Sequence, residues 1–351
     1  MHFNFTMEFS NRLIKWYLDN KRSLPWRDTI DPYSIWLSEI MLQQTRVAQG
    51  LAYFLSFKTH FPTVLDLAKA DEEAVLKLWQ GLGYYSRARN LHATAKYIAN
   101  ELDGIFPNNF QDLLKLKGVG DYTAAAIASF CYNQAVPVVD GNVFRVLARY
   151  FDIETDIAQP AAKKEFAALA AELLPINDAA TFNQAIMEFG ALQCVPQNPD
   201  CSVCVFNDSC LARKFNKVKQ LPVKSKKAKA KIRHFNYLVA EDSLGNTQME
   251  KRVEKGIWQN LYDFPLFETE NVAAINIVSE KLESEYFNEN EIVAVEDFEC
   301  DIIHKLSHQH LHIKFWKVQV DGSLEDGISV EKLKLLPVPI VIHNFIEKAL
   351  E

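Results

Sequence analysis

Four of the six cysteines lie in one short stretch of the chain. They are Cys194, Cys201, Cys204 and Cys210, with the spacing C-x6-C-x2-C-x5-C. Groups of four thiolates bind either tetrahedral zinc or an iron–sulfur cluster. A zinc ribbon usually has two CxxC pairs, whereas this stretch has one. The spacing therefore favours an iron–sulfur cluster, with a zinc site and unligated buried thiols as the alternatives.

The rest of the chain indicates a reducing, aqueous location. No charged leader precedes an apolar segment, so we expect the thiols to stay reduced. No apolar run approaches the roughly 20 residues of a membrane span, and we expect a cytoplasmic protein. The two remaining cysteines, Cys131 and Cys300, stand alone and are expected to act as small buried hydrophobic residues.

The charge is unevenly distributed. The net charge is −7, but residues 1–240 carry 28 basic against 23 acidic residues, and residues 241–351 carry 10 against 22. The acidic balance thus belongs to the last third and does not exclude DNA binding by the first part. Residues 209–240 contain ten Lys or Arg and no acid. We interpret part of this segment as a linker, either solvated or lying along phosphates.

Hydrophobic periodicity changes along the 351 residues, which suggests two domains. Apolar residues recur at three- and four-residue spacing through residues 6–213, which predicts an all-α domain. The expected helices include residues 33–48, 72–78, 87–101, 122–132, 143–150, 161–174 and 181–192. After the linker, alternation in FNYLVAED and IKFWKVQVDG predicts strands, with a turn at Gly245-Asn246 and helices near 272–285 and 339–350. The second domain is therefore expected to be a smaller α/β domain.

Three segments have patterns that suggest chemistry. In LKGVGDYTAAAIASF, the turn Gly118-Val119-Gly120 precedes a helix, where uncovered amides can bind an anion, although a plain helix corner is the alternative. In VPVVDGNVFRVLARY, Asp140 either caps a helix or takes part in catalysis. In YSIWLSEIMLQQTRV, Glu39 begins a polar stripe with Gln43 and Arg46, which a solvated face would also explain.

Taken together, these segments resemble the helix-hairpin-helix DNA glycosylases of the endonuclease III superfamily, and within it the MutY-type adenine glycosylases. The resemblance spans most of residues 24–210. Its motifs are PWR (25–27), WLSEIMLQQTRV (36–47), LWQGLGYYSRARNLH (78–92), LKGVGDYTAAAI (116–127), VVDGNVFRVLAR (138–149), FNQAIMEFGALQC (182–194) and the four cysteines.

The resemblance implies roles for two carboxylates in breaking the bond between adenine and deoxyribose. Glu39 would be the acid that protonates adenine at N7, and Asp140 the anion that supports the oxocarbenium-like sugar. Apolar neighbours should raise the pKa of Glu39, and nearby amides should keep Asp140 ionised. Whether Asp140 forms a covalent intermediate stays open.

Position 122 distinguishes the chain from the lyases of the superfamily. The lyases that the chain resembles have a lysine two residues after the second glycine of the hairpin, and this lysine attacks the sugar. This chain has Tyr122 there. We therefore expect water to be the nucleophile and the base to be removed without strand cleavage. Tyr122 would hydrogen-bond Asp140 or the developing intermediate, and Asn142 would help to hold water.

By resemblance, Gln44 and Tyr84 wedge into the gap that the flipped base leaves, and Thr45 and Leu82 lie beside the opposite base. Further residues would line the adenine pocket: Leu24, Trp26, Arg27, Leu42 and Gln184. Gly118, Val119 and Gly120 would bind the DNA backbone. Ordinary core packing, or surface exposure for Gln184, is the alternative for the wedge and pocket residues.

GIWQNLYDFP and HKLSHQHLHIKFW resemble the MutT-like (Nudix-like) domain that follows the glycosylase in this family and recognises 8-oxoguanine. The intact catalytic Nudix box is missing, so we expect recognition without hydrolysis. Ser307 and His308, in a hairpin loop, are the expected contacts, with an ordinary polar turn as the alternative. Leu306 stands where the family usually has Phe, which puts an aromatic contact in doubt, and Asn260 replaces a more usual Gly.

The resemblance implies three parts: a helical glycosylase domain over residues 1–213 with its 4Fe-4S loop at 194–210, a basic linker over 214–233, and a MutT-like lesion-recognition domain over 234–351. It implies a monofunctional enzyme that removes adenine opposite 8-oxoguanine or guanine in double-stranded DNA. We expect a monomer in the bacterial cytoplasm, associated with the nucleoid. The alternatives are an endonuclease III-like glycosylase/lyase and a non-catalytic DNA-binding or electron-transfer protein. The sequence leaves open whether the cluster is redox-active and which protein partners bind.

Overall fold

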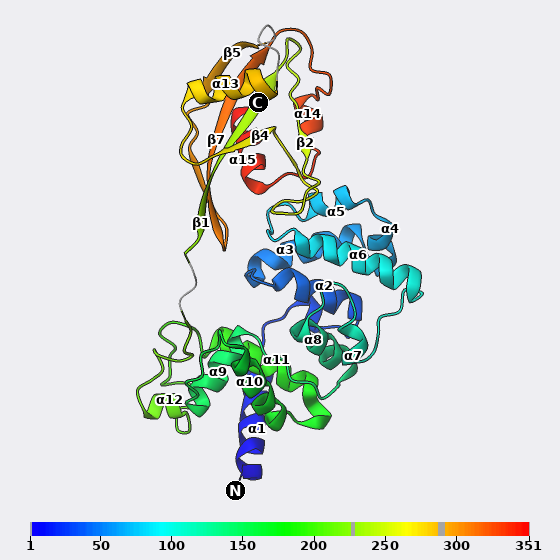
Figure 1. Ribbon diagram of the computed structural model, residues 1–351. Helices are drawn as coiled ribbons and strands as arrows, with labels where there is room; N and C mark the ends of the chain where they lie inside the picture. The colour runs from blue at the N-terminus through cyan, green and yellow to red at the C-terminus, as the bar shows by residue number, and fades with distance from the viewer. Residues whose placement is uncertain (1, 226–228, 287–291, 351) are drawn as a thin grey trace. The chain divides into compact units, whose positions relative to one another are not determined.

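The structure of the protein is a computed structural model that describes residues 2–225, 229–286 and 292–350. The chain divides into two compact units (Figure 1). The first contains residues 1–69 and 90–226, and the second contains residues 70–89 and 227–351. Among the described residues, no helix is long and apolar enough to cross a membrane.

The first unit is helical, as the periodicity predicts. Its elements are α1 (His2–Asn20), η1 (Pro25–Arg27), α2 (Pro32–Leu42), α3 (Val47–His60), α4 (Val64–Lys69), most of α6 (Ser86–Glu101), α7 (Phe110–Leu113), α8 (Asp121–Tyr132), α9 (Gly141–Phe151), α10 (Pro160–Leu173), η2 (Ile176–Asp178), α11 (Ala179–Leu192) and α12 (Leu211–Lys214). Helix α5 (Glu72–Leu78) belongs to the second unit.

Aromatic side chains join the ends of the first unit. The ring of Phe206, in the cysteine loop, stacks on Phe9 of α1 at 4.8 Å between centroids and meets Phe189 of α11 edge-on at 5.3 Å. All three rings are buried. Because such close-packed aromatic contacts bury large apolar areas, they fix the cysteine loop against the terminal helices.

One expected helix is divided in the structure. The sequence predicts a helix over residues 33–48, but α2 ends at Leu42 and α3 begins at Val47. The break is at Gln44, whose φ of 60° lies in the left-handed region that a continuous right-handed helix excludes. The predicted polar stripe is therefore wrong: Gln43 and Arg46 lie outside α2, and Glu39 is buried.

The second unit contains a five-stranded sheet of order β4-β1-β7-β5, with β6 also paired to β7. Strands β1 and β7 run parallel, and the other pairs are antiparallel. Strands β2 and β3 form a separate pair. The bounds are β1 (Lys231–Glu241), β2 (Glu250–Lys251), β3 (Tyr262–Asp263), β4 (Leu266–Thr269), β5 (Ile292–Asp297), β6 (Ile302–Lys305) and β7 (Gln309–Val320).

Helices cover both faces of this sheet. Helix α13 (Ile275–Glu285) packs over the face that carries Trp316 (Figure 1). Helix α15 (Ile340–Ala349) covers the other face, where Phe345 stacks on Phe315 at 3.7 Å between centroids. A short helix, α14 (Val330–Leu333), lies between them in sequence. This arrangement is the α/β domain that the alternating strands predict.

Within the second unit, which we also call the C-terminal unit, residues 70–89 pack against residues 227–351 through specific contacts. Lys77 donates hydrogen bonds to the carbonyl oxygens of Lys334 (2.7 Å) and Leu336 (3.0 Å). Arg89 donates to the carbonyl of Gln259 at 2.7 Å, and Tyr262 donates to Glu73 at 2.8 Å. This segment, which carries the expected wedge residue Tyr84, is thus held on the unit that contains the sheet.

The segment expected to be a linker, residues 214–233, is partly packed. Lys217 pairs with Asp152 (2.8 Å) and Glu154 (2.6 Å), and Leu221 is buried. At its other end the segment enters strand β1. Residues 226–228, in its centre, lie outside the described residues. The basic composition alone did not show these ion pairs, because their acidic partners are distant in sequence.

Candidate active site

A cavity of about 680 Å³ lies in the first unit, between helices α2, α8, α9 and α11. Ten of the residues named from the sequence line it: Leu24, Trp26, Arg27, Glu39, Leu42, Thr45, Tyr122, Asp140, Asn142 and Gln184. These residues come from segments up to 160 positions apart in the chain. A cavity of this size can hold a nucleobase with its sugar, because ligand pockets typically measure about 300–1,000 Å³.

Glu39 reaches the cavity from α2. Asp31 caps this helix by accepting hydrogen bonds from the amides of Tyr33 and Ser34. The Glu39 side chain is buried, and its Oε2 accepts a hydrogen bond from the Tyr122 hydroxyl at 2.7 Å. Burial is the main reason that the pKa of Glu39 rises to about 7, and it outweighs the hydrogen bond from Tyr122. Glu39 is thus poised to exchange a proton near neutral pH.

Asp140 is the N-cap of α9. Its Oδ1 accepts hydrogen bonds from the amides of Asn142 and Val143, each at 2.8 Å, and its Oδ2 accepts one from the Asn142 side chain at 2.8 Å. Capping and a place in the cavity therefore coexist at this residue. Burial raises the pKa of Asp140, although these hydrogen bonds act in the opposite direction. The expectation from sequence considered only the amides and missed the burial.

The hydrogen bond of Tyr122 differs from the one expected with Asp140. Tyr122 hydrogen-bonds Glu39 and not Asp140. The side-chain amide of Asn142 donates to Asp140, and its oxygen accepts from Arg145 at 2.8 Å. Asn142 thus orients the carboxylate, and its role in holding water stays a prediction.

A buried ion cluster forms the wall of the cavity beside Arg27. The guanidinium of Arg27 donates to both carboxylate oxygens of Glu188 at 2.7 Å, and Arg22 also donates to both. Burial acts to raise the pKa of Glu188, but the hydrogen bonds from Arg27 and Arg22 prevail and lower it to about 2. Arg27 thereby keeps a fixed position in the cavity, where its charge also acts on Glu39.

Sequence reasoning missed Arg22, Arg145 and Glu188, which also line the cavity. Arg145 donates to Asn142, to the carbonyl of Gly190 at 2.6 Å and to the carbonyl of Cys194 at 2.7 Å. For Arg145 and Glu188, the available signal was a charged residue inside a largely apolar helix, because such residues are rarely buried without a partner.

The expected wedge residues share an unusual backbone conformation. Gln44 has a φ of 60° and Tyr84 a φ of 49°, both in the left-handed region. Such strain in non-glycine residues concentrates at functional sites. Gln44 is exposed just outside the cavity lining, whereas Thr45 is part of it.

A second pocket, of about 550 Å³, lies in the C-terminal unit. It brings Leu82 and Tyr84 together with Ser307 and His308. The last two are exposed in the turn between β6 and β7, which the hydrogen bond from Leu306 N to Gln309 O closes at 2.8 Å. Trp258 and His304 also line this pocket.

The glycine turn before α8 has the expected form. Gly118 has a φ of 77°, and a Cβ there would lie 2.8 Å from the Cβ of Asn90, so only glycine is accommodated without a shift. Gly120 is the N-cap of α8. The amide of Val119 donates to the carbonyl of Leu116 at 3.1 Å and is therefore already used within the turn.

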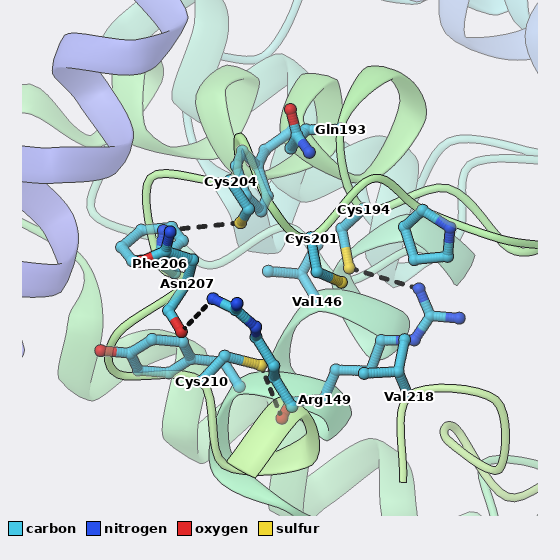
Figure 2. Close-up of a pocket in the computed structure, with 14 residues that line it drawn as sticks. Val146, Arg149, Gln193, Cys194, Cys201, Cys204, Phe206, Asn207, Cys210 and Val218 are labelled. Atoms are coloured by element: carbon cyan, nitrogen blue, oxygen red, sulfur yellow. Dashed lines mark hydrogen bonds between the residues drawn. The ribbon is translucent and has the colours of Figure 1, made fainter. Parts of the chain in front are cut away.

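The four clustered cysteines line one small cavity of about 30 Å³ (Figure 2). Arg149 donates to the Sγ of Cys194 at 3.4 Å, and the amide of Phe206 donates to the Sγ of Cys204 at 3.5 Å. Zinc requires four sulfur atoms at about 2.3 Å from one point. In the parts of the chain that the structure describes, no group of three or more such ligands could hold a single ion. Four thiols around a common space are the ligand set that an iron–sulfur cluster requires.

The chain matches two family models. Residues 37–175 match the HhH-GPD superfamily base excision DNA repair protein, and residues 236–348 match the NUDIX domain. Among solved structures, a thermostable thymine-DNA glycosylase is 28% identical with a TM-score of 0.55, covering 60% of this chain and 98% of its own. An endonuclease III–DNA covalent intermediate, 20% identical, has a TM-score of 0.52 over 59% of this chain and 94% of its own, which concerns the fold alone. The predicted fold class is confirmed.

Curated relatives extend over most of the chain. An adenine DNA glycosylase of Buchnera aphidicola is 36% identical over 315 residues, covering 87% of this chain and 86% of the relative. One from Arabidopsis thaliana is 33% identical, and the match covers 92% of this chain and 59% of the relative. One from Homo sapiens is 44% identical, and the match covers 61% of this chain and 41% of the relative. Together with the carboxylate cavity and the helical fold, these similarities show that the chain belongs to the adenine DNA glycosylase family of base excision repair enzymes.

Proposed function

We propose that the protein hydrolyses the N-glycosidic bond of adenine opposite 8-oxoguanine, or guanine, in double-stranded DNA without cutting the strand. The observation that carries this proposal is the cavity in which a protonatable Glu39, a hydrogen-bonded Asp140 and Tyr122 meet. The names of the relatives support adenine as the base.

Glu39 is the acid in the proposed reaction. Its pKa of about 7 keeps a substantial fraction protonated at neutral pH. The carboxyl group protonates adenine at N7, so that the base leaves as a neutral molecule. Tyr122 holds the carboxyl group through its hydroxyl. Leu24, Trp26, Leu42 and Gln184 enclose the base.

Asp140 supports the positive charge that develops on the sugar when the bond breaks. Three hydrogen bonds from Asn142 and Val143 fix its two oxygens before the substrate arrives. A preorganised, partly buried carboxylate stabilises such charge more strongly than a solvated one. Water then adds to C1′ of the sugar and gives a proton to the Glu39 carboxylate, so that adenine is released and the sugar stays in the intact strand as an abasic site.

The absence of a cavity amine supports hydrolysis without strand cleavage. A lyase needs a lysine to form a Schiff base with the sugar. The described residues that line the cavity include no lysine, and Tyr122 follows the glycine turn in the place where a lyase has one. A phenol hydrogen-bonded to Glu39 cannot form an imine, so water is the nucleophile in our proposal.

We propose that Ser307 and His308 contact the oxidised guanine, with Tyr84 and Gln44 as wedges and Leu82 and Thr45 beside the opposite base. The shared pocket of Tyr84, Leu82, Ser307 and His308 supports this role for the C-terminal unit. Because a serine hydroxyl and an imidazole both form hydrogen bonds, the change to Leu306 removes an aromatic contact but leaves polar readout possible.

The glycine turn at residues 118–120 is proposed to bind a DNA phosphate at the start of α8. Cys194, Cys201, Cys204 and Cys210 are proposed to hold a 4Fe-4S cluster, which braces the loop that contacts α1 and α11. The functional division into residues 1–213, 214–233 and 234–351 is retained as part of the proposal. We further propose a monomer in the bacterial cytoplasm, bound to the nucleoid.

The test is an end-labelled duplex with a single adenine opposite 8-oxoguanine. We expect strand breakage at the adenine only after alkali, and none when Glu39→Gln protein is used. Cleavage without alkali, or borohydride trapping of a protein–DNA adduct, would instead identify a lyase of the endonuclease III kind. Duplex binding without release of adenine would identify a non-catalytic protein and overturn the proposal.

A further inference from the structure

The turn that carries Tyr84 is held in a conformation that its own residues do not favour. Gly81, Gly83 and Tyr84 have φ angles of 93°, 77° and 49°. Glycine adopts such angles readily, but a bulky tyrosine does not. The Tyr84 side chain is 50% exposed, so burial of its ring does not hold it there. Other groups must stabilise the turn.

Arg87 contacts three consecutive residues of this turn. Its Nη2 donates hydrogen bonds to the carbonyls of Leu82 (3.3 Å) and Gly83 (3.1 Å). Its guanidinium lies 5.6 Å from the centre of the Tyr84 ring, within the range of a cation–π interaction. One planar group therefore contacts both the backbone before the tyrosine and the tyrosine ring.

Trp79 also contacts Arg87. The guanidinium lies 5.2 Å from the centre of the fully buried Trp79 ring, and Trp79 Nε1 donates to the same Gly83 carbonyl at 3.0 Å. Burial lowers the pKa of Arg87 to about 10, so the group stays charged at neutral pH. The Gly83 carbonyl thus receives two donors, and its orientation is fixed by both.

The next residues attach the turn to the remainder of the C-terminal unit. Tyr85 donates to the carbonyl of Val338 at 3.4 Å, and Arg89 donates to the carbonyl of Gln259 at 2.7 Å. The residues that follow the turn therefore tie it to the rest of the unit, while the Tyr84 ring stays half exposed. A side chain that is ordered before binding loses less entropy when it enters the DNA.

We propose that Arg87 is a positioning residue that holds Tyr84 in the conformation required to wedge into DNA at the lesion. The inference rests on the proposed role of Tyr84 as a wedge. Arginine suits this position because one guanidinium nitrogen donates to two carbonyls while the planar group lies near two aromatic rings, whereas lysine offers a single point charge. Arg87 acts through Tyr84 and has no contact with the reacting atoms.

The test is a double-mutant cycle for DNA affinity. All proteins carry Glu39→Gln so that binding is measured without base release, on duplexes with adenine opposite 8-oxoguanine or with no lesion. We expect Arg87→Met to weaken binding to the lesion duplex about ten-fold, the loss expected when a charged hydrogen-bond donor is removed. Lesion-free duplex should bind equally well, because the buried guanidinium is not required to contact phosphate. Lys96→Met, which removes an exposed charge from the same helix, serves as the control.

In a Tyr84→Ala background, Arg87→Met should change lesion affinity less than about two-fold, because the side chain that it positions is gone. An equal loss in both backgrounds would mean general destabilisation and overturn the inference. If Arg87→Met does not fold, Arg87→Lys is tested in the same cycle, with partial loss expected only when Tyr84 is present. Should Tyr84→Ala alone leave lesion affinity unchanged, the wedge role fails. A Tyr84 effect without coupling to Arg87 refutes only the positioning role.

Discussion

Replacing Glu39 by glutamine should stabilise the protein at alkaline pH while it removes activity. The pKa of Glu39 rises from 4.5 to about 7 because its carboxyl group is buried in the cavity. A shift of about 2.5 units corresponds to about 3 kcal/mol at 1.36 kcal/mol per unit. This is the free energy by which the ionised carboxylate destabilises the folded protein relative to the protonated form.

The direction of this pH dependence follows from the pH range over which the folded and unfolded states hold the Glu39 proton. The folded protein keeps the proton to higher pH than the unfolded chain does, so the contribution of Glu39 to stability is fully present below pH 4.5 and is lost as the pH rises through about 7. Glutamine remains neutral throughout this range. Its advantage over glutamate should therefore increase with pH.

The assay is urea unfolding followed by circular dichroism at pH 5 and pH 8, combined with single-turnover adenine release. Relative to wild type, the gain of Glu39→Gln in the free energy of unfolding should be about 2 kcal/mol larger at pH 8 than at pH 5. Adenine release should fall by about 100-fold or more. Glu165→Gln, which changes an exposed glutamate on α10, is the control. An equal gain at both pH values, or destabilisation at pH 8, would refute the argument that burial raises the Glu39 pKa.

Three further outcomes are expected. Tyr122→Phe removes the hydrogen bond that favours ionised Glu39, which should raise the pKa of Glu39. The alkaline limb of the single-turnover pH–rate profile should therefore move to higher pH by about one unit. An unchanged limb would mean that it belongs to another group. Glu188→Gln removes the buried carboxylate that pairs with two partly buried guanidinium groups, and urea unfolding should show a loss of about 3 kcal/mol. In Gly118→Ala, the alanine would have to adopt a φ of 77° and approach Asn90 closely. We therefore expect the free energy of unfolding in urea to fall by about 1–2 kcal/mol and duplex binding in filter-binding titrations to weaken. An unchanged free energy of unfolding together with unchanged duplex affinity would contradict the assigned turn geometry.

Much of the catalytic unit could be predicted because its signals are local. The cysteine spacing, the glycine turn and the helix cap at Asp140 each depend on neighbouring residues, and the structure shows the turn and the cap as expected. The resemblance then identified ten residues that line the cavity. The break at Gln44 was missed because its left-handed backbone conformation leaves no periodic signal in an apolar segment.

The sequence by itself determined the two-part chain, the helical and sheet-containing classes of its parts and the residue types available for chemistry, because periodicity and motif spacing are properties of neighbouring residues. Only the tertiary structure decided that Tyr122 bonds Glu39 and not Asp140, and that Arg27 is held by Glu188. It also placed residues 70–89 in one unit with residues 227–351, and it brought Arg87 into contact with the Tyr84 turn. These outcomes depend on burial and on distances between segments remote in sequence, and burial sets the pKa values that the proposed reaction requires.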